Sequence, residues 1–250
     1  MTNPNKSSLL VSLLLITVGT LLLPFLSSCG KGANANPTGL NTQLQIVNLS
    51  PDIQPVNLYL NFLKENTTSY TYPTNSGYFF ISTLLPPVQL RTATLAPINL
   101  VTIDSTVALK ANSKYTLFIT GFRSDNSIKK SMLLLDTATV PPLGRAIVRF
   151  VHCSPTSAPL DLRANGIGTA LWTKIPFDSV SKYVQLPVGN YNFTINLNTS
   201  PDNAQFTLPN VTIQDGRAYT IYTQGIVGRT DSVAFGAAIL TNNLLLKTTK

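Results

Sequence analysis

The sequence predicts an all-β protein made of two tandem immunoglobulin-like β-sandwich domains, which follow an N-terminal signal segment and a flexible tether. Two observations carry this prediction. Short apolar runs rich in β-branched and aromatic residues alternate with turn signals about every ten residues, and none of them has a helical period. Two separated blocks of the sequence also recur at one constant offset of 104 residues.

The first element is a signal segment at residues 1–28. Lys6 precedes an apolar run at 9–23, and the segment ends in the letters LSSCG around Cys29, which resemble the bacterial lipobox. In that motif the cysteine thiol is lipidated before the chain is cleaved on its N-terminal side. A membrane-spanning anchor is the alternative, but the run is short for the roughly 20 residues that a bilayer core needs, and Pro24 interrupts its end. We therefore expect Cys29 to become the first residue of the mature chain.

The second element is a tether at residues 29–41, which is small, polar and without periodicity. Several acyl chains on Cys29, each contributing about 0.8 kcal/mol per buried CH₂, would anchor it permanently to a membrane. Gly30 stands where an aspartate would favour inner-membrane retention under the enterobacterial sorting rule, and no acidic cluster follows that would resemble the surface-export signal of Bacteroidetes lipoproteins. The expected location is the cell envelope, at the outer membrane facing the periplasm, with the cell surface as the alternative.

The internal repeat sets the domain organisation. The matched blocks are 50–61 with 154–165, and 114–121 with 218–225. A Pro/Gly break at 140–144 separates the two copies. We expect a first sandwich at 42–139 and a second at 144–246, each of a normal size for a small domain.

The strands are clearest in the second unit. In order, they are expected at 145–152, 159–164, 179–186, 190–196, 206–213, 218–224 and 233–240. Turns come from Asn165-Gly166, Gly189-Asn190 and Asp215-Gly216, because glycine and asparagine tolerate a positive φ. Seven strands at this spacing predict a sandwich of two antiparallel sheets, whose strand order stays open.

Several segments resemble one family. They are RFVHCSP followed by APLDL at 149–162, LPVGNY at 186–191 and GRAYT at 216–220. These segments are similar to the hallmarks of the domain of unknown function 4397, which often occurs in tandem in secreted and cell-envelope proteins. The first unit is less similar, since Asn48 and Leu49 replace the His-Cys pair and its Leu-Pro-Pro segment at 85–87 lacks the glycine turn. The resemblance implies a fold and an envelope setting, and it supplies no activity.

Composition argues against several classes of function. From Cys29 onward, seventeen Lys and Arg face ten Asp and Glu, a net charge of +7, and the only adjacent basic pair is Lys129-Lys130. Such scattered charge indicates no nucleic-acid partner. With one histidine and Cys153 as the only other cysteine, we expect neither a disulfide nor a metal site. Nucleophile-elbow and phosphate-loop motifs are absent, so we expect no cofactor and no enzyme.

The tripeptide His152-Cys153-Ser154 places a base, a thiol and a hydroxyl together. Successive side chains on a strand point to opposite faces, so His152 and Cys153 would not readily share a proton. We therefore interpret Cys153 as a buried small hydrophobe and His152 as a hydrogen-bonding residue at a strand end. An enzyme would instead require the pair to meet in a cleft with shifted pKa values.

An aromatic-rich stretch in the first unit is a candidate ligand platform. It contains Tyr70, Tyr72, Tyr78, Phe79 and Phe80. If exposed, Tyr70, Tyr72 and Tyr78 could stack on sugar rings, as aromatic side chains do in carbohydrate-binding sandwiches. The alternative is that alternate members of the stretch pack the core, because aromatic residues favour strands in any case.

Four sites match an Asp-(Ser/Thr)-apolar pattern that resembles the acceptor of Bacteroidetes periplasmic O-glycosylation. The acceptor residues would be Ser105, Thr137, Ser179 and Ser232. The alternative is that Asp-Ser and Asp-Thr are ordinary turn dipeptides.

Two functions remain open. The first is a non-catalytic binding or adhesion module for a glycan or an envelope protein, with recognition on loops at one end of a rigid scaffold. The second is a structural spacer of the envelope with no ligand of its own. Exposed aromatic residues on a concave face would favour binding, whereas polar loops and a buried aromatic stretch would favour the spacer.

Overall fold

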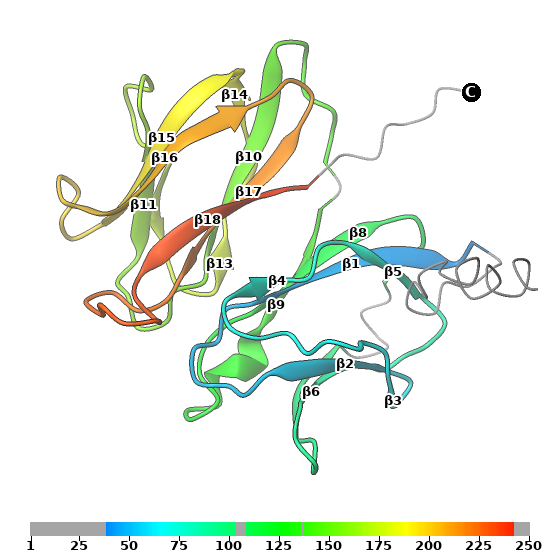
Figure 1. Ribbon diagram of the computed structural model, residues 1–250. Coiled ribbons are helices and arrows are strands. Elements are labelled where there is room, and N and C mark those ends of the chain that lie inside the picture. The colour runs from blue at the N-terminus through cyan, green and yellow to red at the C-terminus, as the bar shows by residue number, and fades with distance from the viewer. Residues whose placement is uncertain (1–38, 104–108, 137, 243–250) are drawn as a thin grey trace, which may run out of the picture.

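The computed structural model describes residues 39–103, 109–136 and 138–242 (Figure 1). The chain forms four β-sheets arranged as two sandwiches, which confirms the expected all-β fold with two sandwich domains. Helix is limited, in the part described, to one 3₁₀ turn, η1 (Ser127–Lys130). No helix among these residues has the length and apolar character needed to cross a membrane.

The first sandwich contains β1 to β9. One sheet has the order β4 (Thr74–Asn75), β1 (Asn41–Asn48), β8 (Lys114–Ile119) and β9 (Met132–Leu135), with β5 (Phe79–Ser82) also paired to β1. The facing sheet has the order β3 (Leu63–Lys64), β2 (Val56–Leu60), β6 (Val88–Thr92) and β7 (Asn99–Ile103).

The second sandwich repeats this topology with β10 to β18. One sheet has the order β13 (Ser179–Val180), β10 (Arg145–His152), β17 (Ala218–Gln224) and β18 (Gly236–Thr241), with β14 (Val184–Pro187) also paired to β10. The facing sheet has the order β12 (Trp172–Ile175), β11 (Leu160–Ala164), β15 (Gly189–Leu197) and β16 (Ala204–Ile213).

One sheet of each sandwich is mixed, so the expectation of two antiparallel sheets was wrong for that sheet. β1 runs parallel to β8, and β10 runs parallel to β17. The facing sheets are antiparallel, as expected. The physical reason is that the parallel partners are joined through the facing sheet, and a long crossover allows either direction.

Two strand expectations for the second unit also needed correction. The single strand expected at 179–186 is two short strands, β13 and β14, which both pair with β10. Between them, the Ser181 hydroxyl accepts a hydrogen bond from the Phe150 N–H at 2.8 Å and takes the place of a strand partner. β12 was not expected, because only Trp172 and Ile175 mark it as apolar.

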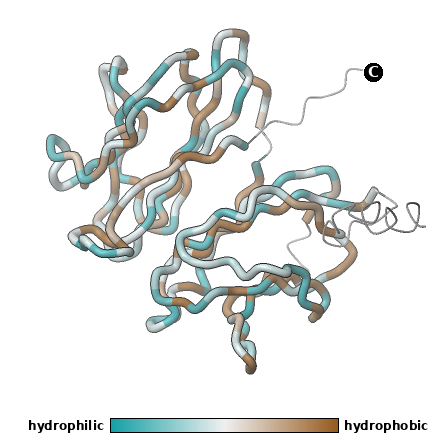
Figure 2. Tube along the Cα trace, in the orientation of Figure 1, coloured by the Kyte–Doolittle hydropathy of each residue, from teal (hydrophilic) through white to brown (hydrophobic). Residues whose placement is uncertain are grey.

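Each sandwich has its own hydrophobic core, formed by alternate residues of the strands (Figure 2). On β1, Leu44 and Ile46 point into the first core. On β10, Val148 and Phe150 do the same in the second. This alternation leaves the intervening residues of β1 and β10 on the opposite faces of their sheets.

The Ser-Pro motif that opens each repeat has a structural role. The Ser50 hydroxyl donates to the Gly121 carbonyl, and the Ser154 hydroxyl donates to the Gly225 carbonyl, both at 2.6 Å. Both glycines have a positive φ, and a Cβ atom on Gly225 would lie 2.1 Å from the Ala234 carbonyl oxygen. Only glycine fits such a position, which explains why the glycine recurs with the serine.

The two sandwiches pack against each other through the outer faces of their mixed sheets. Val47, Leu49, Phe118, Val151, Cys153, Tyr222 and Leu240 form a third buried cluster there. The repeat offset makes Val47 equivalent to Val151 and Phe118 equivalent to Tyr222, and the rings of the last pair lie 5.6 Å apart. The same patch of each repeat therefore covers the other, as in an isologous dimer.

Candidate binding site

A hollow of about 230 Å³ lies where β1 begins. It is lined by Gly39, Asn41, Gln43, Phe80, Asn112 and Ser113. Pockets for drug-sized ligands have roughly 300–1,000 Å³, so this hollow fits one small ring or part of an extended ligand.

Three segments bring these residues together. Gln43 and Phe80 are direct cross-strand partners on β1 and β5. The loop before β8 is held against β1, because the Asn112 N–H donates to the Asn41 carbonyl at 2.8 Å and the Gln43 N–H donates to the Ser113 carbonyl at 2.9 Å. The left-handed φ of +57° at Asn112 is one that asparagine adopts more readily than most residues.

The lining is aromatic and neutral polar. Phe80 is 49% exposed, and none of the lining residues that the structure describes carries a charge. The Gln43 Oε1 atom is buried and accepts no hydrogen bond from the part of the chain that the structure describes. A buried acceptor without a donor is uncommon. An aromatic face beside amide groups suits a neutral polyhydroxylated ring.

The three tyrosines proposed for stacking do not share this site. Tyr70 is partly buried against the core of the first sandwich, and burial raises its pKa to about 12. Tyr72 is also partly buried, with its pKa raised by burial and then by the charge of Asp231. The Tyr78 hydroxyl donates to Asp136 at 2.9 Å, between the sandwiches. Of the aromatic stretch, Phe80 lines the hollow.

A buried polar cluster joins the two sandwiches beside the apolar contact. Arg149 of β10 forms an ion pair with Asp136, which follows β9, and both side chains are almost fully buried. Arg149 also donates to the Thr220 hydroxyl at 2.9 Å and to the Leu135 carbonyl at 3.0 Å. Burial raises the pKa of Asp136, and the guanidinium of Arg149 opposes that shift.

Hydroxyl and amide groups complete this cluster. Asp136 accepts from the Thr116 hydroxyl at 2.7 Å and from Tyr78, whose oxygen accepts in turn from the Asn242 amide at 2.8 Å. Since Tyr78 belongs to the first sandwich and Asn242 to the second, their hydrogen bond crosses the interface in addition to the contacts of Arg149. A fully paired buried network of this kind fixes a geometry more than it adds stability.

The side chains of the His-Cys-Ser tripeptide are buried and are held by local contacts. The Nδ1 atom of His152 accepts from the Ser154 N–H at 3.3 Å, which assigns the proton to Nε2, 2.9 Å from the Ser157 hydroxyl oxygen. Ser157 then accepts this hydrogen bond and is not activated. Burial lowers the pKa of His152 to about 4, whereas burial and the charge of Asp178 raise the pKa of Cys153 well above its usual value. The structure thus agrees with the structural interpretation of both residues.

The remaining predicted site residues are those proposed for glycosylation and lipidation. Ser232 lies exposed before Val233, and Ser179 is partly buried on β13. Cys29, Ser105 and Thr137 lie outside the described residues. Across the described ranges, His, Cys, Asp and Glu form no group of three or more that could hold a metal ion.

Sequence reasoning did not single out Asn41, Gln43, Asn112 or Ser113. The available signal was weak. Asn41 and Gln43 occupy the polar positions of an alternating strand, which normally face solvent. Asn112 and Ser113 read as an ordinary turn before β8.

Comparisons with known proteins give one clear match. The profile of a family described as Domain of unknown function (DUF4397) matches residues 42–163 and 146–244. The search of the curated proteins found no match.

Solved structures are similar only at a low level. The TIE protein of Bacillus anthracis is 12% identical at a TM-score of 0.24, over 74% of this chain and 34% of that one. The CBMbc module of family CBM26 from Eubacterium rectale Amy13K, solved with maltoheptaose, is 10% identical at a TM-score of 0.22, over 80% of this chain and 96% of that one. These TM-scores carry neither a ligand nor an activity over to this chain.

Proposed function

This chain belongs to the DUF4397 family and carries two copies of its domain, and we propose that it is a non-catalytic, lipid-anchored envelope protein that binds a glycan at the hollow beside Phe80. The observation that carries the proposal is the lining itself. A half-exposed aromatic ring stands directly opposite an amide whose buried oxygen has no donor among the described residues.

The chemistry of the lining selects the class of ligand. Sugar rings present C–H groups on one face and hydroxyl groups around the edge. The first would stack on Phe80, and the second would donate to Gln43 and exchange hydrogen bonds with the Asn112 amide. The absence of charged lining residues favours a neutral sugar over a phosphate or a uronic acid.

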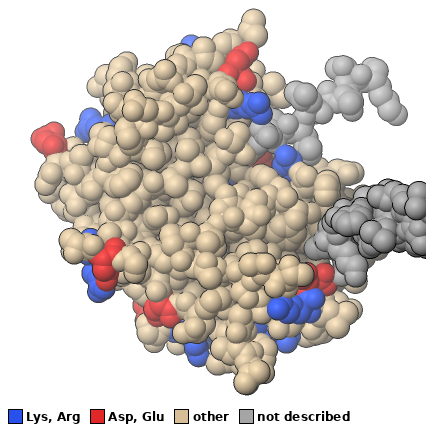
Figure 3. Space-filling model, viewed as in Figure 1, with Lys and Arg blue, Asp and Glu red and all other residues tan. Residues whose placement is uncertain are grey.

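The anchor and the location are part of the same proposal. Acyl chains on Cys29 would hold the protein at the outer membrane, facing the periplasm. Charge gives no reason to propose a nucleic-acid partner. On the face that Figure 3 shows, basic and acidic groups lie in small, separate groups of mixed sign among neutral residues.

A rigid spacer is the second candidate, and the contact between the sandwiches favours it. Two domains joined only by a linker would move independently, whereas these share an apolar cluster and the Arg149–Asp136 ion pair. A rigid two-domain unit could hold a partner at a fixed distance from the membrane. The two functions are compatible, because none of the residues that line the hollow belongs to the apolar cluster of that contact.

Binding to immobilised oligosaccharides tests the proposal. The mature chain and its Phe80→Ala and Gln43→Ala variants would be applied to an array of neutral bacterial envelope glycans. Loss of one stacking contact is worth roughly 1 kcal/mol or more, so each variant should bind the retained glycan at least about fivefold more weakly.

Leu95→Ala supplies the matched control, because Leu95 is exposed in the β6–β7 turn and remote from the hollow. It should bind like the parent protein. Binding that survives both hollow variants would place the ligand elsewhere, and no binding to any glycan would favour the spacer.

A further inference from the structure

One end of the first sandwich carries four large apolar side chains in contact with solvent. They are Leu40, Phe62, Leu63 and Leu84, with exposed fractions of 42%, 60%, 67% and 57%. We call these four residues the entry-end patch, because they lie at the end where the described chain enters β1. Their grouping at one end distinguishes them from singly scattered surface hydrophobes, which need no explanation.

Backbone hydrogen bonds show that the patch is one surface. Leu40 precedes β1, and its carbonyl accepts from the N–H of Thr83, the neighbour of Leu84, at 2.9 Å. The β2–β3 turn that carries Phe62 is joined to the same β5–β6 loop, because the Asn61 N–H donates to the Pro87 carbonyl at 3.1 Å. Three segments that are distant in sequence therefore meet at this end of the sandwich.

The second sandwich gives an internal comparison. The corresponding turns there carry Gly144, Gly166 and Gly189 in place of Leu40, Phe62 and Leu85, although Leu143 and Val188 beside them are exposed apolar side chains, at 94% and 46%. Phe62 and Gly166 both have a left-handed backbone, with φ of +67° and +74°. Glycine adopts that conformation freely, whereas for a bulky residue it costs on the order of 1 kcal/mol or more. A phenylalanine kept there despite this cost points to a use for its side chain.

We propose that the entry-end patch docks on the lipid bilayer that holds the anchor. This inference rests on the proposed lipidation of Cys29. Cys29 precedes Gly39 by ten residues, a distance of at most about 36 Å even when fully extended, so the patch cannot move far from the membrane.

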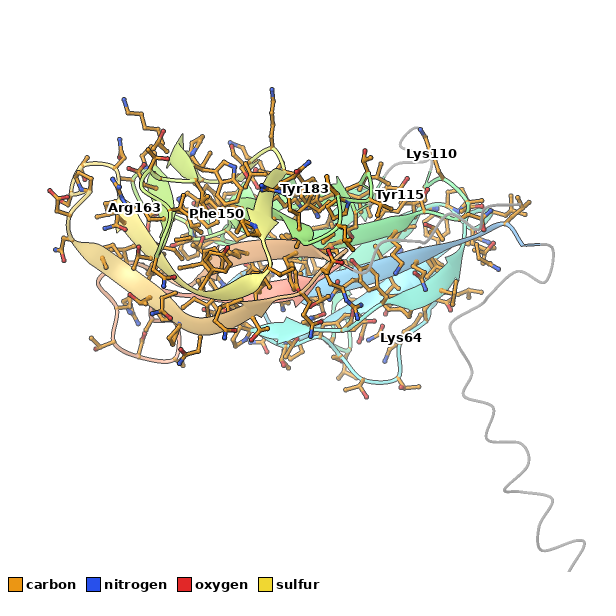
Figure 4. The ribbon with its side chains drawn as sticks, turned by 90° about the horizontal axis from the view of Figure 1, so that it is seen from above. Lys64, Lys110, Tyr115, Phe150, Arg163 and Tyr183 are labelled. Atoms are coloured by element: carbon orange, nitrogen blue, oxygen red, sulfur yellow. The ribbon has the colours of Figure 1, made fainter. Side chains whose placement is uncertain are left out.

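The chemistry of this end fits an interface between lipid headgroups and acyl chains. Apolar side chains insert at that depth, and exposed lysines beside them meet anionic headgroups. Lys64 and Lys110 lie toward this end of the molecule (Figure 4). Glu65, next to Lys64, is an acidic residue of the same end. Docking also places the hollow beside Phe80 near the membrane surface.

Fluorescence quenching by brominated lipids tests the docking. The mature chain, with a polyhistidine tag in place of the acyl chains, would be held on vesicles of phosphatidylethanolamine and phosphatidylglycerol that contain a nickel-chelating lipid. Phe62→Trp reports on the patch, and Leu95→Trp, in the β6–β7 turn at the other end of the strands, is the matched control. The parent protein gives the fixed signal of Trp172 for subtraction. Because the tether is artificial, the result does not depend on Cys29, whose lipidation is read separately from the intact mass of the native protein.

Brominated acyl chains should quench Phe62→Trp at least about threefold more than Leu95→Trp, since only an inserted ring reaches them. Adding Leu63→Ser and Leu84→Ser should remove most of this difference. Equal quenching at both positions would overturn the proposal. A blue shift of Phe62→Trp that rises with protein concentration without vesicles would also overturn it, because a second copy of the chain would then cover the patch.

Discussion

Replacing Arg149 by methionine would leave the carboxyl group of Asp136 buried without its cationic partner. Asp136 would keep the hydroxyl groups of Thr116 and Tyr78, but Arg149 contributes the ion pair and two further hydrogen bonds. Removing one member of a buried pair costs about 3–5 kcal/mol, because the remaining charge stays desolvated. We expect Arg149→Met to lower the free energy of unfolding by that amount near neutral pH.

The double variant Arg149→Met/Asp136→Leu separates the charge from the packing. It removes both charges together and leaves Thr220 and Tyr78 bonded to Asn242. Its loss should therefore be only about 1–2 kcal/mol, for the hydrogen bonds removed. Urea unfolding followed by circular dichroism measures all three proteins, together with Asp136→Leu alone for a double-mutant cycle.

The pH dependence supplies an independent test. Burial raises the folded-state pKa of Asp136, and Arg149→Met removes the guanidinium that opposes the rise. A raised carboxyl pKa favours folding at low pH and weakens it as pH rises from the unfolded value through the folded one. The deficit of Arg149→Met should thus shrink between about pH 8 and about pH 5. A deficit below about 1 kcal/mol, or a double variant as unstable as the single one, would refute this reasoning.

Three further predictions follow from buried and exposed groups. Because burial lowers the pKa of His152 to about 4, the protein should lose about 3 kcal/mol of stability as pH falls from about 6.5 to about 4. The variant His152→Asn, which has the residue found at Asn48 in the first repeat, should not show this pH-dependent loss when both proteins are unfolded in urea over the same pH range. Cys153 should resist iodoacetamide in the native protein and react once urea unfolds it, as mass spectrometry would show; rapid native labelling would contradict its burial. If the Asp-Ser pattern is an acceptor, Ser232→Ala should lower the intact mass of protein from its native host by one glycan, whereas an unchanged mass would leave Asp231-Ser232 as an ordinary turn.

His152 and Asn48 show how one repeat explains the other. Both side chains accept a hydrogen bond at 3.3 Å from the N–H of the serine two residues later. The two residues differ in type, but each side chain accepts the hydrogen bond of the serine N–H at the bend where the Ser-Pro motif begins. Comparing the two copies therefore supports a structural role for His152.

Strand positions followed from periodicity, whereas strand direction did not. β10 and β17 begin and end where the alternating pattern placed them. Side-chain alternation is the same for parallel and antiparallel pairs, so it contained no information on the parallel pairing of β1 with β8. The direction in which two strands so far apart in the sequence pair depends on how the chain between them crosses through the facing sheet.

The contact between the sandwiches could have been predicted from the sequence, but the alternation of apolar and polar residues does not reveal it. β1 and β10 end in nearly continuous buried runs, and Val47 and Val151 occupy positions that would face solvent in a one-sided sheet. Continuous apolar runs are typical of strands that are buried on both faces. The hollow has no such signature, because neutral polar residues at strand ends look alike whether or not they bind a ligand.

Backbone NMR titration with a neutral envelope oligosaccharide tests the binding proposal most directly. The proposal predicts shift changes confined to the amides of 39–43, 79–81 and 112–113, and their loss in Phe80→Ala. Shift changes located elsewhere, or none with any glycan retained from the native envelope, would contradict it.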